Sequence, residues 1–570
     1  MNILLLTTAH NSLSQRVQAE LAERGHAVPV ALATSEQAML DAVAGTAPDL
    51  VVAPMLKKAI PAALWRKHTC LIVHPGIVGD RGPSSLDWAL ARSERVWGVT
   101  VLQADAEMDA GPVWASHEFM LPARPHSKAS LYRNEVTEAA VRGVLDAVAR
   151  FESGRFAPAP LDYGNPRVRG ELRAPMKQTD RAIDWQQDTT AEVARKIRAA
   201  DSSPGVLETS WGEPYHLYGA HEEDRLKGRP GQLIAKRHGA VCIGTVDGGV
   251  WVSHLKAGRP GAIKLPAAQV LGARLADIAE SSIDFDAPAD HRTFREIRYT
   301  EQGAVGFLAF DFYSGAMNTG QCRRLRDAYL AARARPTKVI VLLGGRDFFS
   351  NGIHLNTIEA ADDAADESWR NIVAIDDLVL EIINTMSHLT VAALRGNAGA
   401  GGAMMALAAD QVFARNGVVL NPHYKGMGGL HGSEYWTYLL PRRVGGDMAA
   451  ALTDSCRPLG TRAAQRIGFI DAAFGANVAS FEADVSARAE AMASDAHFWH
   501  RLKAKHDARI ADERRRPLAA YRQHELARMR ANFHGPDTGY HEARARFVHK
   551  GKLPATPAAP TAAARHSAVS

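Results

Sequence analysis

The stretch GNAGAGGAMMALAAD, residues Gly396 to Asp410, combines a glycine-rich turn with the start of an alanine-rich helical pattern. It follows the apolar run LTVAAL (389–394), which predicts a buried strand. A glycine-rich connection of this kind often places main-chain N–H groups at a helix N-terminus, where they act on a ligand. The first position that could carry acid–base chemistry holds Met404. The stretch therefore predicts an α/β unit whose site lacks that side chain.

The same stretch does not fit a dinucleotide fingerprint. That fingerprint needs G-x-G-x-x-G or G-x-G-x-x-A, and counted from Gly399 the sixth residue is Met404. No acidic residue ends a strand about twenty positions later. We therefore expect no nicotinamide cofactor, and a glycine-rich packing turn is the alternative to a binding site.

Length and charge narrow the classes of function. The chain has 570 residues, 46% of them apolar and 23% charged, and a formal net charge of +5. This length suits about three or four domains of roughly 100–200 residues each. A charge this small indicates anionic small ligands more than nucleic acid. The basic run RIADERRRP (509–517) is typical of a solvated helix end.

Cysteine spacing and hydropathy indicate where the protein works. The four cysteines, at positions 70, 242, 322 and 456, are far apart and form no CxxC or Cys/His pattern, which predicts neither disulfides nor a metal site. The N-terminus MNILLLTTAHN predicts a first β-strand and not a signal peptide. No window approaches about 18 uninterrupted apolar residues. We therefore expect a cytoplasmic protein without a membrane segment.

The order of patterns predicts an α/β protein in several parts. Strands alternate with helices over 1–165, which favours a Rossmann-like domain with a parallel sheet covered on both faces. Short β-like runs between glycine turns in 166–280 are typical of a small, partly open barrel. A second α/β domain follows over 281–515, then a helical extension over 516–552. The Ala/Pro-rich tail 553–570 should be disordered.

Two polar residues mark the first candidate site. His74 ends the strand in VHPGIVGDRGP, and Asp109 follows the strand in GVTVLQADAEMDAGP. Ligands of open α/β sheets bind beyond the carboxyl ends of strands. A histidine titrates near neutral pH and a carboxylate can orient it, so the two residues are a candidate proton-transfer pair. A structural histidine and a turn aspartate are the alternative.

This region resembles the folate-dependent formyltransferases. The resemblance rests on IVHPG (72–76), DRGP (80–83) and GVTVLQADAEMDAGP (98–112), and it continues in RAPMKQTDRAIDWQQDTTAEVARKIRAADSSPGV (173–206), which is similar to the C-terminal domain of methionyl-tRNA formyltransferase. The resemblance implies that 10-formyltetrahydrofolate donates a one-carbon group. It also implies that His74 and Asp109 assist proton transfer and that Arg81, Gly82 and Asp105 help to bind the folate.

One position departs from this family's pattern. The family carries an asparagine two residues before the histidine, and this chain has Ile72 there. An amide that hydrogen-bonds the developing oxyanion is therefore missing, and the loss of one such donor costs about two to three orders of magnitude in rate. Either another group replaces it or formyl transfer is slow. Gln103 and Asn11 are the candidate replacements.

The second half resembles the crotonase, or enoyl-CoA hydratase/isomerase, superfamily. The matching motifs are FDFYSGAMNTG (310–320), DFFSNGIHL (347–355) and the opening glycine-rich stretch. The resemblance implies an oxyanion hole for an acyl-CoA thioester, made by the N–H groups of Ile353 and Gly401. It implies coenzyme A as a ligand, with contacts from neighbouring positions that are assigned by position only: Ser314, Ala316, Asn318, Gly352 and Gly402.

Hydratases of this superfamily place one glutamate at the position of Met404 and a second about twenty residues later, near Tyr424, and neither is present here. Paired carboxylates activate water for addition to a double bond, so hydration is not expected. The loop LNPHYKGMGGLHGSEYWTYLL (420–440) offers other groups. Its glycines could bring Tyr424 and Glu434 together for proton transfer at a carbonyl carbon. The further candidates in this loop are His423, Lys425 and His431.

The two halves together resemble the hydrogenase maturation factor HypX family. The resemblance covers nearly the whole chain, including HYKGMGGLHGSEYWTYLLPRRVG (423–445) and the tail from Tyr521 to Pro554. It implies formyl transfer from 10-formyltetrahydrofolate to coenzyme A, then cleavage of formyl-CoA to carbon monoxide and CoA for the nickel–iron hydrogenase. The expected partners are small molecules and hydrogenase maturation proteins, not nucleic acid or membrane. A formyltransferase for aminoacyl-tRNA and a non-catalytic scaffold that binds folate or CoA are the alternatives.

Overall fold

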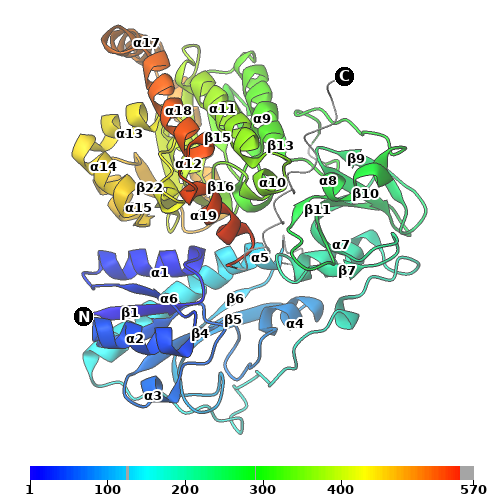
Figure 1. Cartoon of the computed structure of the whole chain (residues 1–570), viewed down its shortest axis with the longest axis vertical. Helices are drawn as coiled ribbons and strands as arrows, with labels where there is room; N and C mark the ends of the chain where they lie inside the picture. Colours follow the sequence, from blue (N-terminus) through cyan, green and yellow to red (C-terminus); the bar gives the residue numbers. More distant parts are fainter. Residues whose placement is uncertain (123–126, 289, 552–570) are drawn as a thin grey trace, which may run out of the picture.

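The computed structural model describes residues 1–122, 127–288 and 290–551, and these form three sheet-containing units followed by C-terminal helices (Figure 1). The predicted helical extension is described as far as Gly551, and the tail predicted to be disordered lies outside the described residues. No helix among the described residues is long and apolar enough to cross a membrane.

The N-terminal unit is a six-stranded sheet with helices on both faces, as predicted for a Rossmann-like domain. Alternate residues of β1 (Ile3–Thr7) enter different cores: Ile3 and Leu5 pack under α1 (Ser12–Glu23) and α6 (Thr137–Ser153), while Leu4 and Leu6 pack under α2 (Glu36–Thr46) and α3 (Ala62–Trp65). This two-sided burial is why the strand reads as a continuous apolar run. The remaining strands are β2 (Val30–Leu32), β3 (Leu50–Ala53), β4 (Cys70–His74), β5 (Val96–Gln103) and β6 (Val113–Met120).

The predicted parallel sheet is confirmed for β2, β1, β3 and β4, but it was wrong for β5 and β6. The order is β2-β1-β3-β4-β5-β6, and the first four strands are parallel, but β4 pairs with β5 and β5 with β6 in antiparallel fashion. The helix before β5 is the short α4 (Ser85–Ala91), which contacts α7 of the next unit, and only a short loop joins β5 to β6. A short loop can join antiparallel strands but not parallel ones.

The second unit is the predicted open barrel. Its strands run β7-β8-β11-β10-β9, all in antiparallel pairs, and β7 does not pair with β9 among the described residues. Their bounds are β7 (Val206–Glu208), β8 (Tyr215–Glu223), β9 (Leu233–Arg237), β10 (Ala240–Gly244) and β11 (Gly249–Ala257), with β12 (Leu265–Pro266) beside β11. Two helices, α7 (Thr190–Ala200) and α8 (Ala267–Leu271), contribute to its core.

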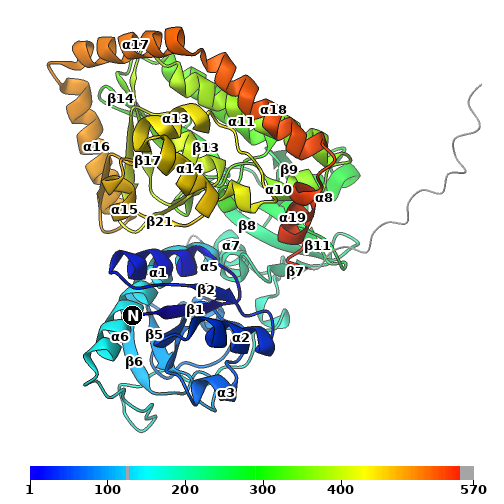
Figure 2. The ribbon, with the colours of Figure 1, turned by 60° about the vertical axis from the view of Figure 1, so that its left-hand side comes forward.

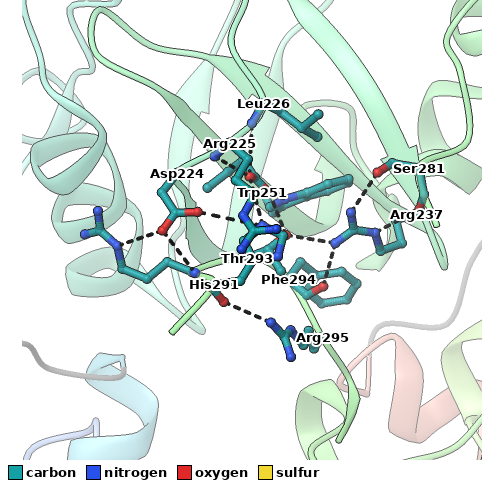
Figure 3. Close-up of polar contacts among 12 residues, drawn as sticks. Asp224, Arg225, Leu226, Arg237, Trp251, Ser281, His291, Thr293, Phe294 and Arg295 are labelled. Carbon is teal, nitrogen blue, oxygen red and sulfur yellow. Dashed lines mark hydrogen bonds and ion pairs between the residues drawn. The ribbon is translucent and has the colours of Figure 1, made fainter. Parts of the chain in front are cut away.

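A polar strap ties this barrel to the chain that leads into the third unit (Figure 3). The Arg237 guanidinium lies 4.5 Å from the Trp251 ring centroid and donates hydrogen bonds to the side chain of Thr293 and the carbonyl of Phe294. Glu223 accepts from Trp251 Nε1 at 2.7 Å and Thr293 Oγ1 at 2.5 Å. These buried contacts fix the exit of the chain from the barrel.

Three neighbouring residues of the strap are of types that commonly bind metal ions. One ligand atom from each of Glu223, Asp224 and His291 lies within 4.8 Å of the others. The Glu223 oxygens already accept the two side-chain bonds above and the N–H groups of Arg225 and Leu226. The geometry therefore assigns Glu223 to hydrogen bonding within the fold.

The third unit contains the largest core and two sheets. The main sheet runs β13-β14-β15-β17-β19-β22 and is parallel apart from the β13–β14 hairpin. The second sheet contains β16, β18 and β20, which are parallel, and an antiparallel β21. The bounds are β13 (Ile297–Gln302), β14 (Val305–Phe310), β15 (Val339–Leu343), β16 (Phe348–Ser350), β17 (Leu389–Leu394), β18 (Asn397–Gly399), β19 (Gln411–Arg415), β20 (Val419–Asn421), β21 (Leu459–Gly460) and β22 (Ala472–Phe474).

Helices cover these sheets and carry polar groups into the core. The main ones are α9 (Thr319–Arg333), α11 (Ala364–Ile383), α13 (Trp436–Val444) and α16 (Val478–Ser494), and the short α12 (Gly401–Ala406) follows β18. Because β16, β18 and β20 are parallel, their carboxyl ends meet at one edge. The segments that follow them, from Asn351, Ala400 and Pro422, therefore converge.

The C-terminal helices close over the third unit. Figures 1 and 2 both show α18 (Leu518–His534) running along α11, after the long α17 (Phe498–Arg515). The last helix, α19 (Gly539–Val548), contacts α10 (Leu355–Glu359), and Arg544 Nε donates to Glu359 at 2.7 Å. The side chains of Ser368 and Tyr540 share a buried hydrogen bond of 2.8 Å.

Polar contacts lock the first unit onto the third. Asp347, in the loop before β16, accepts hydrogen bonds from Ser130 at 2.7 Å, Arg133 at 2.8 Å and Asn134 at 3.0 Å. Ser130 lies in α5 (Lys128–Leu131), which continues into a π-helical turn, η1 (Tyr132–Val136). A three-donor clamp on one carboxylate fixes the relative position of the two units.

Two candidate active sites and the cavities that join them

The first site is a cavity of about 1030 Å³ beyond the carboxyl ends of β3 and β4 and beside the loop that follows β5. His74 and Asp109 both line it, as predicted, and His74 Nδ1 lies 3.6 Å from Asp109 Oδ2. Asp109 adopts a left-handed backbone, with φ of 56°. Its carboxylate also lies 3.4 Å from the N–H of Gly82.

A second carboxylate at His74 was missed by the sequence analysis. Asp80 Oδ2 lies 3.0 Å from His74 Nε2, and the Asp80 side chain is fully buried. Its other oxygen lies 3.2 Å from Nε of Arg173, which arrives with the chain that leads into the barrel. A Cβ on Gly76 would stand 2.5 Å from both His74 Nε2 and Asp80 Oδ2, so this position needs glycine. The imidazole is therefore held between two carboxylates, one buried and one in the cavity.

The predicted folate-binding residues are only partly in the cavity. Gly82 and Asp105 line it, whereas Arg81 does not. Arg81 instead pairs with Glu107 at 2.7 Å and donates to the carbonyl of Met108 at 3.1 Å. The Arg81 guanidinium thus braces the loop that carries Asp109 and does not line the cavity.

The two candidate replacements for the missing amide both line this cavity. Gln103 Oε1 accepts from Trp114 Nε1 at 3.1 Å, and Asn11 Oδ1 accepts from Ser14 as the cap of α1. In each amide the carbonyl oxygen is occupied, and the NH2 group has no hydrogen-bond partner among the described residues. Both side chains therefore keep a donor for a ligand, while Ile72 contributes only an apolar surface.

The second site is a smaller cavity, of about 370 Å³, at the edge where β16, β18 and β20 converge. Ile353 and Gly401 line it, and within the described chain neither of their N–H groups has an acceptor. Ala400 has a φ of 47°, which turns the main chain at this point. The N–H of Ala400 donates to the carbonyl of Asn421, and the following N–H, of Gly401, has no acceptor among the described residues. Because buried N–H groups are almost always paired, two such donors in one cavity indicate an anion or carbonyl site.

Tyr424 and Glu434 lie in this same cavity, as the loop pattern predicted. The Tyr424 hydroxyl is buried and without a hydrogen-bond partner among the described residues. A Cβ on Gly401 would meet Glu434 Oε1 at 1.9 Å, so the carboxyl group lies directly against the Gly401 main chain. Burial raises the pKa of Glu434 well above its ordinary value, and Asp376 and Glu525 raise it further. Burial and the nearby Glu434 raise the pKa of Tyr424 well above 10.

Other predicted residues of this half have packing roles. Met404 is fully buried in the core, which fills the place of a hydratase glutamate with an apolar side chain. Asn318 caps α9, and its Oδ1 accepts from the N–H of Gln321. Ser314 and Ala316 line the cavity, whereas Asn318, Gly352 and Gly402 do not.

The remaining polar residues of the 420–440 loop also differ in whether they line the second cavity. His423 lines the cavity, and its Nδ1 lies 2.8 Å from the carbonyl of Asn421. His431 does not line it and packs against His524 with ring centroids 5.7 Å apart. Lys425 pairs with Asp454 at the surface. Only His423 of these three therefore has access to a ligand in the cavity.

A third cavity, of about 390 Å³, lies between the two sites. It shares Arg133, Asp201, Ser202 and Phe348 with the wall of the first cavity and Tyr313 and Ser314 with the wall of the second. Tyr313 donates to Asp201 at 2.5 Å and accepts from Lys264 at 2.7 Å. The third cavity therefore adjoins both sites and shares mostly polar residues with them.

Four lysines lie near one another beside these cavities: Lys57 lines the first and Lys264 the second, and Lys256 and Lys550 lie near them. Burial lowers the pKa of Lys264 to about 8, and the cations Lys550 and Lys256 lower it further against the opposing effect of Asp201. The pKa of Lys550 is lowered by burial and by Lys57 and Lys256. Cations from three units that repel one another favour the approach of an anionic ligand.

Comparisons with known proteins agree with this architecture. Residues 5–148 match the formyl transferase family, residues 175–270 the formyl transferase C-terminal domain, and residues 314–554 the enoyl-CoA hydratase/isomerase family. The chain is 23% identical, over 39% of its length and 69% of the relative's, to a methionyl-tRNA formyltransferase of Nitrosomonas eutropha. The two predicted family resemblances are thereby confirmed.

Two relatives match from end to end. The hydrogenase maturation factor HoxX of Bradyrhizobium diazoefficiens is 50% identical over 98% of this chain and 96% of its own. The crystal structure of HypX from Aquifex aeolicus in complex with tetrahydrofolic acid is 46% identical, with a TM-score of 0.93 over 98% of this chain and 97% of that chain. The match includes the barrel and the C-terminal helices as well as the two catalytic folds.

Proposed function

Because the chain belongs to the HypX/HoxX family of hydrogenase maturation factors, we propose that it makes carbon monoxide for a nickel–iron hydrogenase. Its first unit transfers a formyl group from 10-formyltetrahydrofolate to coenzyme A, and its third unit splits formyl-CoA into carbon monoxide and CoA. The observation that carries this proposal is a third cavity that shares wall residues with both the His74 cavity and the Glu434 cavity. Coenzyme A must carry the formyl group from the first site to the second. A single chain that contains both sites keeps this intermediate at a high effective concentration at the second site.

The first site has the groups that formyl transfer to a thiol requires. His74 takes the thiol proton as the sulfur attacks the formyl carbon. When the bond from that carbon to the folate nitrogen breaks, its electron pair goes to nitrogen, and His74 returns the proton there. Asp80 stabilises the imidazolium in between, and the NH2 groups of Gln103 and Asn11 are placed to bind the developing oxyanion. The bound tetrahydrofolate of the Aquifex aeolicus relative supports folate as the donor.

Nearby lysines support coenzyme A as the carrier. Its phosphates are anionic, Lys57 lines the first cavity and Lys264 the second, and Lys256 and Lys550 lie near them. The Ile353 and Gly401 amides offer two donors to a thioester carbonyl. Formyl-CoA thus provides anionic phosphates for the lysines and a carbonyl acceptor for the two unpaired N–H groups.

The second site supports cleavage of formyl-CoA with a balanced proton count. Neutral Glu434 gives its proton to the sulfur as the carbon–sulfur bond breaks and its electron pair moves to sulfur. The resulting carboxylate takes the formyl proton, and the carbon–hydrogen pair becomes the lone pair of carbon monoxide. Glu434 is then neutral again, and no oxidant is needed. The amides and the Tyr424 hydroxyl hold the carbonyl oxygen in place.

A labelled-carbon experiment tests the proposal. Purified protein is mixed with 10-formyltetrahydrofolate labelled at the formyl carbon, with and without CoA, and the gas is trapped on haem. The proposal predicts labelled carbon monoxide only when CoA is present. Labelled formyl-CoA without carbon monoxide would limit the protein to formyl transfer, and no labelled product at all would favour a binding scaffold.

The proposal also includes a cellular location and partner molecules for the reaction. We expect the protein in the cytoplasm, with small molecules as substrates and hydrogenase maturation proteins as the recipients of carbon monoxide. An aminoacyl-tRNA acceptor has less support, because the relatives with that acceptor match only the first half of the chain.

A further inference from the structure

The main chain that presents Glu434 is held in an unusual conformation. Glu434 and Tyr435 both adopt left-handed backbones, with φ of 60° and 58°. Two successive residues other than glycine rarely do so unless their surroundings enforce it. The contacts that hold this turn therefore also determine where the Glu434 carboxyl group points.

Asp376, on α11, holds the turn from one side. Its Oδ1 accepts from the N–H of Glu434 at 2.8 Å, and its Oδ2 accepts from Ser433 Oγ at 2.8 Å. The Asp376 side chain is fully buried, and it does not line the cavity. Both of its oxygens are thus committed to the turn and not to a ligand.

Glu525, on α18, holds the turn from the other side. Its Oε1 accepts from the N–H of Thr437 at 2.8 Å and from Thr437 Oγ1 at 2.5 Å, and its Oε2 lies 3.5 Å from Ser433 Oγ. Glu525 is also fully buried and outside the cavity wall. The helix α18 therefore supports the segment that presents Glu434.

The carboxyl groups of Asp376, Glu434 and Glu525 share a dry region around Ser433. Three carboxylates this close cannot all be ionised in a low dielectric. Burial raises the pKa of Asp376 to about 6 and that of Glu525 to about 8, with Asp376 adding to the shift of Glu525. Other groups also face this region: the cation Arg522, the acid Asp377, and the neutral Cys322, Tyr424 and Tyr435.

We propose that Asp376 and Glu525 are positioning residues for Glu434: they clamp the 433–435 turn from two helices and keep Glu434 neutral so that it can give a proton to the departing sulfur. This inference rests on the proposed cleavage of formyl-CoA. It assigns to the C-terminal extension a direct part in that reaction.

The test uses three variants of the full-length protein: Asp376→Asn, Glu525→Gln and, as control, Glu490→Gln, which replaces an exposed glutamate of α16. Removing a neighbouring negative charge makes Glu434 easier to ionise. With saturating formyl-CoA, kcat for carbon monoxide release at pH 9 should fall about tenfold or more in Asp376→Asn and less in Glu525→Gln. At pH 6.5 each should stay within about twofold of the control, because Glu434 is then neutral in all of them. KM should change little.

A second readout needs no substrate. The infrared C=O stretch of a protonated carboxyl group is followed against pH in the resting protein, and the part lost in Glu434→Gln is assigned to Glu434. The proposal predicts that this band disappears at a lower pH in Asp376→Asn than in the Glu490→Gln control. If the wild type releases no carbon monoxide, the proposed function fails, and the band still decides the inference.

Two results would overturn the inference. One is a Glu434 band that disappears at the same pH in all variants. The other is a kcat that falls by the same factor at pH 6.5 and pH 9, which is the pattern of a residue needed only for folding. Glu525→Gln keeps an acceptor oxygen for Thr437, so it separates charge from fold if Asp376→Asn is too unstable to assay.

Discussion

The two sites use their polar groups in opposite ways. At the first site His74 is paired on both ring nitrogens, with Asp80 and Asp109. At the second site the Tyr424 hydroxyl and the N–H groups of Ile353 and Gly401 have no partner among the described residues. The proton carrier of the first site is thus already paired in the folded protein, whereas the buried donors of the second site have no partner in the described chain.

This difference fits the chemistry of the two proposed steps. Formyl transfer passes a proton from sulfur to nitrogen through one imidazole, and paired carboxylates keep that imidazole in place. Cleavage of formyl-CoA needs a buried pocket that binds the thioester carbonyl. The unpaired donors of the second site can donate hydrogen bonds to that carbonyl oxygen. Paired groups stabilise the fold, and unpaired buried groups weaken it.

The largest expected effect is at Glu434. Glu434→Gln keeps the size of the side chain but removes the exchangeable acid, so carbon monoxide release from supplied formyl-CoA should fall by about 10²–10⁴-fold. Trapping on haem gives the rate, and Glu490→Gln is the matched control. A fall of less than about threefold would mean that Glu434 is not the proton donor.

His74 should affect only the first step. His74→Asn removes the proton carrier, so formyl transfer to CoA should slow by about 10²–10⁴-fold. Release of carbon monoxide from supplied formyl-CoA should stay at the wild-type rate, because the change lies in the other cavity. The exposed His500→Asn is the control. Equal losses in both assays would contradict the separation of the sites.

The two carboxylates at His74 should differ in their effect on stability. Asp80 is buried between His74 and Arg173, so Asp80→Asn should lower the free energy of unfolding by roughly 3 kcal/mol. Asp109 faces the cavity, so Asp109→Asn should slow formyl transfer with little loss of stability. Urea unfolding with a parallel formyl-transfer assay compares them. Similar midpoints for the two variants would remove the distinction between a buried and a cavity carboxylate.

Tyr424 should show the cost of an unpaired donor. Tyr424→Phe removes a buried hydroxyl without a partner, so the free energy of unfolding should rise by about 1–2 kcal/mol while carbon monoxide release falls. The control is Tyr329→Phe, where the lost hydroxyl is hydrogen-bonded to Thr385 at 2.6 Å, and that protein should lose stability. Chemical unfolding of both variants checks the opposite signs.

The last comparison concerns the pH dependence of stability. The pKa of Glu525 rises from an ordinary 4.5 to about 8 in the folded protein, so the folded state binds this proton more tightly than the unfolded state. Stability from this group is complete below about pH 4.5 and is lost as the pH rises through about 8. Glu525→Gln should flatten the decline of unfolding free energy across that window. An unchanged slope would show that Glu525 is already ionised in the folded protein.

The sequence predicted the residues that local motifs carry. His74 and Asp109 follow strands, and Tyr424 stands where the superfamily has a glutamate, so each could be placed from its neighbours in the chain. Glu434 was reached because glycines surround it. The fold was predictable for the same reason, apart from β5 and β6, which a short loop joins as an antiparallel pair.

The positioning residues could not be found in this way. Asp80 stands in the quoted DRGP motif, but its burial depends on Arg173, which arrives 93 positions later. Asp376 has an acidic neighbour, Asp377, and Glu525 lies in the charged run RQHELARMR, so both are typical of solvated helix faces. They become buried only because α18 packs along α11, which no local pattern reports.

The most direct test of the account is to trap the intermediate that links the two sites. Glu434→Gln is supplied with CoA and 10-formyltetrahydrofolate labelled at the formyl carbon, and the quenched mixture is analysed by mass spectrometry. The account predicts labelled formyl-CoA that accumulates in this variant and does not form in His74→Asn. If Glu434→Gln accumulates no formyl-CoA while the wild-type protein releases labelled carbon monoxide, the two sites do not act in series through formyl-CoA.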